Sequence, residues 1–193
     1  MVTAEQSAIA AVAQAAACQA APSLGAAWNA LAGVNDPEIP VLSITELGMV
    51  RRIAWDAGEP GTLHVHVTPT YCGCPATDLI MSGIREALAK IGVISAEIEI
   101  LLSPPWSTAF MTPDAARKLR TYGIAPPGSA VPGTAQAIDV SGLGPLRRAP
   151  IAVPCPRCGS HDTTRVAEFG STACKAQYRC RTCLEPFDFF KPL

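Results

Sequence analysis

The fold is decided by the stretch Thr62-Leu-His-Val-His-Val-Thr-Pro-Thr-Tyr-Cys-Gly-Cys-Pro-Ala76. Its first half alternates apolar and polar residues, which predicts a half-buried strand with Leu63, Val65 and Val67 on the inner face. A loop with two cysteines follows. The proline directly after Cys74 is typical of the first position of a helix. The stretch therefore predicts a strand, a loop and a helix, with a thiol at the point where the chain enters the helix.

The segments on both sides of this stretch have the pattern of a small α/β domain. Further strands are predicted over residues 49–55 and 96–102, and helices over residues 23–33, 75–92 and 113–122. Prolines and glycines separate these elements, because neither residue continues a helix or a central strand well. The fold class expected is α/β (α+β), with a small mixed sheet packed against helices.

The composition changes sharply toward the C-terminus. Residues 151–193 hold five of the eight cysteines, and residues 124–150 hold five prolines and four glycines without sustained periodicity. These changes predict four parts along the chain. They are an alanine-rich tail over 1–21, an α/β domain over 22–123, a Pro/Gly-rich linker or arm over 124–150, and a zinc-ribbon-like domain over 151–193.

Four of the C-terminal cysteines have the spacing of a metal site. Cys155 and Cys158 form one C-x2-C pair, and Cys180 and Cys183 form another. Two such pairs complete a tetrahedral set of thiolates, and so small a domain needs the metal to fold. Structural zinc is the expected metal, and iron or an iron–sulfur cluster on the same four sulfurs is the alternative.

The ribbon is expected to be a hairpin followed by a third strand. Residues 164–169 and 175–179 are strand-like, with a turn at Gly170-Ser171 between them, and Phe187, Phe189 and Phe190 would form the small core. Cys174 starts the second hairpin strand, about 20 Å from the metal at roughly 3.3 Å per residue. It is therefore not expected to be a metal ligand, and the hypothesis for it is a free thiol or a residue of an interaction surface.

Cys74 is the candidate functional thiol of the α/β domain. A helix N-terminus presents unpaired N–H groups and the positive end of the helix dipole, which predicts a lowered pKa for this thiol. Cys72, two residues earlier, is near enough to share an iron or a cluster, and Asp36 and Glu38 are candidate assisting carboxylates. No catalytic triad, phosphate-binding loop or pair of catalytic carboxylates is evident, so no catalytic residue is assigned.

Charge and hydropathy exclude several classes of protein. The formal net charge is -1, with 15 Lys and Arg against 16 Asp and Glu, so there is no general attraction to nucleic acid or to an anionic membrane. No window approaches the ~18 apolar residues that span a membrane. The chain has no Lys or Arg before Arg51, which argues against a secretory or mitochondrial leader, and a cytoplasmic location is expected.

Longer motifs carry a resemblance to known families. Three stretches resemble the small domain of iron–sulfur assembly accessory proteins such as SufT. They are Asp36-Pro-Glu-Ile-Pro-Val-Leu-Ser-Ile-Thr-Glu-Leu-Gly-Met-Val50, residues 68–76 and Pro104-Pro-Trp-Ser107. The more specific motifs are Trp106-Ser-Thr-Ala-Phe-Met-Thr-Pro-Asp114, Gly123-Ile-Ala-Pro-Pro-Gly128, Cys155-Pro-Arg-Cys-Gly-Ser160 and Phe169-Gly-Ser-Thr-Ala-Cys-Lys-Ala176. With them, about residues 22–193 resemble the PaaD family (also called PaaJ) of phenylacetate-degradation proteins.

The resemblance implies a non-catalytic accessory subunit of the phenylacetyl-CoA epoxidase, a ring-epoxidising multicomponent oxygenase of phenylacetate catabolism. Such a subunit would assist the maturation or repair of an iron or iron–sulfur centre. Cys74 matches the reactive cysteine of the family and would hold iron or a cluster transiently. Two positions depart from the family pattern. Cys72 replaces a small residue, and Glu46 stands where Asp is more common.

Two other functions remain as hypotheses. One is a thiol or iron–sulfur redox protein that passes electrons within the oxygenase, and the other is a nucleic-acid-binding zinc ribbon. The ribbon carries six Lys and Arg against four Asp and Glu, and four thiolates with one divalent metal cancel that excess, which argues against nucleic acid. The partners expected are epoxidase subunits and iron–sulfur assembly proteins, and a homodimer is left open.

Overall fold

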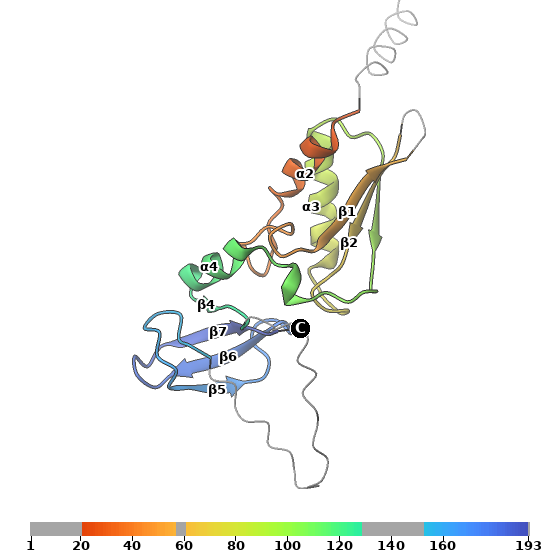
Figure 1. The fold of residues 1–193 in the computed structure, drawn as a ribbon. Coiled ribbons are helices and arrows are strands. Elements are labelled where there is room, and N and C mark those ends of the chain that lie inside the picture. Colours follow the sequence, from red (N-terminus) through yellow and green to blue (C-terminus); the bar gives the residue numbers. More distant parts are fainter. Residues whose placement is uncertain (1–20, 57–60, 129–152, 193) are drawn as a thin grey trace, which may run out of the picture.

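The computed structural model describes residues 21–56, 61–128 and 153–192, which form two small sheets with helices beside them (Figure 1). The alanine-rich tail predicted over 1–21 lies outside the described residues except for Ala21, as does the predicted arm from residue 129 onward. None of the helices in the described ranges has the length and apolar content that a bilayer crossing requires.

The first sheet has the strand order β1-β2-β3. Strand β1 (Val50–Trp55) pairs antiparallel with β2 (Leu63–Val67), and β2 pairs in parallel with β3 (Ala96–Ile100). The parallel pair needs a crossover, which the long helix after the cysteine loop supplies. The inner positions of β2 are buried and its histidines face outward, so the strand predicted from the alternating pattern is confirmed.

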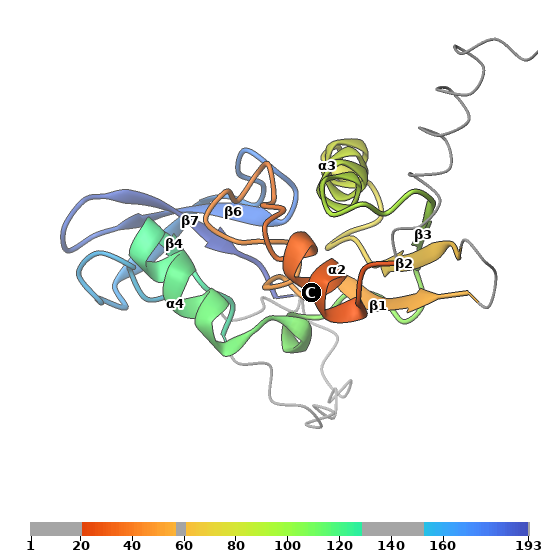
Figure 2. The ribbon, with the colours of Figure 1, turned by 90° about the horizontal axis from the view of Figure 1, so that it is seen from above.

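Two helices cover one face of this sheet (Figures 1 and 2). Helix α2 (Leu24–Leu31) begins after Ser23, whose hydroxyl accepts a hydrogen bond from the Ala26 N–H at 3.1 Å. Helix α3 (Thr77–Lys90) buries Ile80, Ile84 and Leu88 in the core. It starts two residues later than the sequence predicted, because the prolyl residue and Ala76 still belong to the preceding turn.

The segment between α2 and β1 has little regular structure but supplies much of the core. Its apolar side chains Ile39, Leu42, Ile44 and Leu47 are all buried. Gly48 has a φ of +67°, and a Cβ on it would lie 2.1 Å from the Phe110 carbonyl oxygen, so only glycine permits this approach of two backbones. The segment is thus held against the chain that follows β3.

That following chain contains the 3-10 turn η1 (Thr108–Phe110) and helix α4 (Pro113–Tyr122). Just before η1, the indole N–H of Trp106 donates to the Leu47 carbonyl oxygen at 2.8 Å, and the ring is buried. The hydrogen bond satisfies the polar atom of a large buried ring, which fixes the position of Trp106 at the end of the α/β domain.

The second sheet has the strand order β4-β7-β6-β5. Strands β5 (Thr163–Ala167), β6 (Lys175–Cys180) and β7 (Pro186–Phe190) form the expected hairpin and third strand. Strand β4 (Ile124–Ala125), at the start of the predicted arm, pairs in parallel with β7. The predicted tight turn at Gly170-Ser171 is instead a longer loop over residues 168–174, which ends at Cys174.

The two sheets share a packed interface. Phe190 lies in the same buried cluster as the α/β core, and its ring meets Trp106 edge-to-face with centroids 5.8 Å apart. Phe187 and Phe189 pack instead with Tyr178 in the ribbon's own core. The expectation that Phe190 belongs to the ribbon core is therefore wrong, because successive strand residues face opposite sides of the sheet.

We expect Phe190→Ala to lower the free energy of unfolding by about 3–5 kcal/mol, since it removes a fully buried ring from the shared core. Phe169→Ala is the matched control, because that ring is 63 % exposed and should change stability by less than about 1 kcal/mol. Denaturant unfolding measures both values. Equal losses in the two variants would contradict the shared core.

Candidate functional site

The four ribbon cysteines lie on two turns of the same local structure. The Cys155 N–H donates to the Ser160 carbonyl, and the Cys180 N–H donates to the Glu185 carbonyl, each at 2.9 Å. The residue four positions after the first cysteine has a positive φ in both turns, 74° at Gly159 and 65° at Leu184. Each turn thereby directs two thiols to one side.

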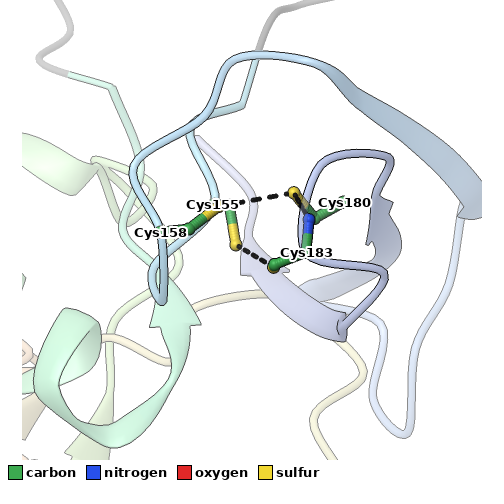
Figure 3. A group of neighbouring side chains, drawn as sticks. All are labelled: Cys155, Cys158, Cys180 and Cys183. Carbon is green, nitrogen blue, oxygen red and sulfur yellow. Dashed lines mark hydrogen bonds between the residues drawn. The ribbon is translucent and has the colours of Figure 1, made fainter.

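The sulfurs of the two turns converge on one point (Figure 3). The Sγ atoms of Cys155 and Cys183 are 3.7 Å apart, those of Cys158 and Cys180 are 3.6 Å apart, and all four lie within 4.8 Å of one another. Four thiolates at 2.3 Å from a tetrahedral ion would be about 3.8 Å apart. The sulfur spacing thus fits a metal ion bound by four thiolates.

The backbone of the second turn favours the thiolate form of Cys180. The Cys183 N–H donates to the Cys180 sulfur at 3.4 Å. This hydrogen bond is the main cause that lowers the pKa of Cys180 to about 6, with a second contribution from the Thr182 N–H. Because metal ligands must be deprotonated, this sulfur is prepared to bind a cation at neutral pH.

Cys74 occupies the turn between β2 and α3. The Thr77 N–H and hydroxyl both donate to the Cys74 carbonyl, at 3.2 and 2.8 Å, which closes the turn that leads into the helix. The thiol is partly buried and packs against the main core. A partly exposed thiol on a rigid turn remains accessible to an ion or to a partner protein.

Two carboxylates flank this thiol from the loop after α2. Asp36 is buried, and its Oδ1 accepts hydrogen bonds from the Glu38 and Ile39 N–H groups, both at 2.8 Å. These bonds fold the chain around Pro37 and fix the position of Glu38. The charges of Glu38 and Asp36 both act on Cys74, so the structure brings the predicted thiol and both predicted carboxylates together.

The predicted lowering of the Cys74 pKa is wrong. Burial raises the pKa of the thiol most, and the carboxylates of Glu38 and Asp36 raise it further, whereas a hydrogen bond from the Ala76 N–H lowers it. The helix-end effect is therefore present but weaker than desolvation and the two negative charges. At neutral pH the free protein holds Cys74 mainly as the thiol.

Cys174, a ribbon residue, lies beside the same Glu38 carboxylate that acts on Cys74. Its sulfur lies 4.0 Å from Glu38 Oε2 and 3.0 Å from Thr172 Oγ1, and it belongs to the buried cluster of the α/β domain. It is outside the four-cysteine group, as the sequence predicted. Its role as an interaction residue stays a prediction, and in the structure the surface that covers it is the α/β domain of the same chain.

Tyr71 and Lys175 complete these surroundings, and no pattern in the sequence singles them out beyond their proximity to the two cysteines. The pKa of Tyr71 is raised to about 12 by burial and by the charges of Cys74, Glu38 and Cys174. Lys175 is buried, and its ammonium lies 3.5 Å from the Glu38 carbonyl oxygen and 3.5 Å from an Asp188 carboxylate oxygen. These two residues connect the facing loops of the two sheets.

Other candidate residues lie elsewhere. Cys72 is exposed and, within the described ranges, belongs to no group of metal-ligand atoms. Glu46 pairs with Lys118 at 2.6 Å and accepts from the Ser43 N–H. Although burial opposes them, these partners lower the pKa of Glu46. Glu46 is thus held as a structural carboxylate.

The outer histidines lie beside carboxylates along the sheet. His64 lies 3.4 Å from Glu97 and His66 lies 3.7 Å from Glu99, each opposite its partner in the register of β2 and β3. Each histidine therefore has a carboxylate neighbour on the adjacent strand.

The structure thus combines a small α/β domain with a ribbon that holds four clustered cysteines. Two protein families match the corresponding parts of the chain. Residues 24–100 match "Iron-sulfur cluster assembly protein", and residues 144–191 match "PaaD zinc beta ribbon domain".

Relatives identify the family more closely. The chain is 46% identical over 172 residues to a "Putative 1,2-phenylacetyl-CoA epoxidase" subunit of Escherichia coli, covering 89% of this chain and 94% of that protein. The "Fe-S protein maturation auxiliary factor YitW" of Bacillus subtilis is 37% identical over 41% of this chain and 76% of its own length. A factor of the same description from Porphyromonas gingivalis is 33% identical over 45% of this chain and 80% of its own length. The chain belongs to the PaaD family of phenylacetyl-CoA epoxidase subunits.

We expect Cys180→Ser to lose the ribbon's metal and its structure, because the site then has three thiolates and the ribbon is too small to fold without the ion. Cys72→Ser is the matched control, since it changes an exposed thiol outside the group of four. Metal analysis and circular dichroism of the full chain measure the effect. Normal metal content in Cys180→Ser would contradict the four-cysteine site.

The charge of Glu38 should control the reactivity of Cys74. Glu38→Gln removes a negative charge that raises the pKa of the thiol, so alkylation of Cys74 should become faster at pH 8 and its pH profile should move to lower pH. Iodoacetamide labelling of iron-free protein whose ribbon is filled with zinc, followed by peptide mass spectrometry, measures the profile. Glu97→Gln, on the outer face of β3, should leave it unchanged. A profile that stays in place in Glu38→Gln would show that the charge does not act on Cys74.

Proposed function

We propose that this chain is an accessory subunit of a ring-epoxidising phenylacetyl-CoA monooxygenase. It assists the maturation or repair of an iron or iron–sulfur centre and does not itself epoxidise the substrate. The family membership supports the link to the oxygenase, and the names of the maturation-factor relatives support the second part. The single observation that carries the proposal is a partly exposed thiol, Cys74, beside the carboxylates of Glu38 and Asp36.

This arrangement suits iron that is carried rather than kept. A thiolate and carboxylates are good ligands for ferrous iron, and a cation would favour deprotonation of the thiol by offsetting the negative charges around it. Burial and these charges hold Cys74 protonated in the free protein, so loading iron is coupled to release of a proton. The thiol's partial exposure allows transfer to a partner protein.

The cysteine group of the ribbon has a different role in this proposal. Cys155, Cys158, Cys180 and Cys183 hold structural zinc, which stabilises the fold of the ribbon and places it against the α/β domain. The closed set of four sulfurs supports this, because a structural zinc site has no open position. The partners are epoxidase subunits and iron–sulfur assembly proteins, in a cytoplasmic setting.

A redox function of the ribbon is the second candidate, since four thiolates also bind a single iron or an iron–sulfur cluster. Metal and acid-labile sulfide analysis of anaerobically purified protein separates the two. A colourless protein with one zinc supports the structural role. A brown protein with iron and sulfide on the ribbon cysteines would replace it with electron transfer.

We expect Cys74→Ser to fold normally but to lower epoxidase activity and the iron content of the oxygenase when both are produced together. The loss should be roughly tenfold or more, since even outer-shell partners of a metal typically matter about tenfold. Cys72→Ser is the matched control, because that thiol is exposed and two residues away. Full activity in Cys74→Ser would remove the case for iron handling at this thiol.

A further inference from the structure

Cys174 is a ribbon residue that is buried by the other domain. The ribbon's own core is built from β4, β6, β7 and the first cysteine turn, and Cys174 is not part of it. The thiol is only 4 % exposed and belongs to the α/β core cluster together with Phe190. A cysteine that merely filled space in the ribbon would not need to face a carboxylate of another domain.

The Cys174 thiol and the Cys74 thiol share Glu38 as a neighbour. The Cys174 sulfur is 4.0 Å from Glu38 Oε2, and Glu38 also acts on the Cys74 thiol. The Tyr71 ring and both cysteines belong to the same core cluster, and the charges of Cys74 and Cys174 both raise the pKa of the Tyr71 hydroxyl. Two sulfurs from different domains thus border one carboxylate and one phenol.

The hairpin that carries Cys174 is held in place by bonds on both sides. The Lys175 ammonium contacts the Glu38 carbonyl and the Asp188 carboxylate, so it joins the α/β domain to β7. The Cys174 carbonyl accepts from the Lys191 N–H at 2.9 Å. The position of the thiol therefore depends on the docked ribbon and not on a free loop.

The donor set is chemically specific. Two thiols and a carboxylate form the mixed sulfur and oxygen environment that suits ferrous iron and related divalent ions. Among groups of three or more candidate ligands in the described ranges, only the ribbon quartet has all its ligand atoms within 4.8 Å of one another, so at least one pair among Cys74, Cys174 and Glu38 lies farther apart. An open set of this kind fits an ion that is taken up and released, in contrast to the closed quartet.

We propose that Cys174 is the second sulfur ligand of the iron carried at Cys74, with Glu38 as an oxygen ligand between them. The cargo site is then shared between the two domains, and the ribbon completes it by docking. This inference rests on the proposed function, because it assumes that Cys74 holds iron. It assigns the second thiol to Cys174 instead of the neighbouring Cys72.

The test uses cobalt(II) as the probe on the reduced, anaerobic full chain with the quartet already filled with zinc. The sulfur-to-cobalt charge-transfer band reports how many thiolates bind the added ion. We expect Cys174→Ser and Cys74→Ser each to retain about half of the band per bound cobalt and the double variant to lose it, because each thiolate contributes separately. Cys72→Ser should keep the full band. Zinc analysis of each sample verifies that the quartet remains filled.

Each other outcome points to a specific failure. A full band in Cys174→Ser with half a band in Cys74→Ser would overturn the shared site and leave iron handling at Cys74 standing. Half a band in Cys72→Ser would assign the second thiol to Cys72 and equally overturn it. A full band in both Cys74→Ser and Cys174→Ser would overturn the shared site together with the role of Cys74.

A measurement on the unmodified chain protects the test against variants that fold poorly. X-ray absorption at the cobalt edge counts the sulfur ligands directly, and the zinc of the quartet does not contribute there. Two sulfurs and additional oxygen or nitrogen ligands are expected. One sulfur, or none, would overturn the shared site whatever the variants show.

Discussion

The packing of the ribbon against the α/β domain is the interaction on which the rest of the structure depends. Phe190 of β7 packs in the α/β core against Trp106. The Lys175 ammonium of β6 donates a hydrogen bond to the Glu38 carbonyl oxygen in the loop after α2. The apolar contact supplies most of the stabilisation, because a fully buried aromatic ring removes a large area from water. The Lys175 contact then orients the ribbon against the loop that carries Glu38. Strand β4, which directly follows α4, extends the ribbon sheet and links the two domains a second time.

This interface concentrates negative charge and sulfur in one place. Asp36 and Cys174 are buried, Cys74 and Glu38 are partly so, and burial is the largest cause that raises the pKa of each of the four groups. Among the described residues, Lys175 is the cation whose charge lowers the pKa values of Asp36, Glu38 and Cys174. Unpaired buried anions are costly, so the free protein keeps its thiols protonated and a bound cation would change the balance. The same physical feature therefore explains the protonated thiols of the free protein and would favour a cation at the proposed interface site.

The chain thus has thiols in two contrasting surroundings. In the ribbon, four thiols converge at the spacing of a tetrahedral ion, and backbone N–H groups stabilise the thiolate of Cys180. At the interface, the donors are fewer and more widely spaced, and they include carboxylates. A closed site suits an ion that holds a fold together, whereas an open one suits an ion that is passed on. In an accessory subunit of an oxygenase, the first site would maintain the docking surface and the second would serve the iron chemistry of a partner.

The amino-acid sequence by itself determined the elements and the ribbon site. The alternation of apolar and polar residues predicts β2, and the apolar stripe of Ile80, Ile84 and Leu88 predicts α3. The spacing of the two C-x2-C pairs predicts the cysteine group. All three are local patterns in the sequence. Only the tertiary structure decided three features: the direction in which the pKa of Cys74 is shifted, the packing of Phe190 in the α/β core, and the contact between Cys174 and Glu38. Cys174 and Glu38 are 136 positions apart in the chain. Burial and long-range contact depend on how the domains pack, and no pattern within a single segment encodes that packing.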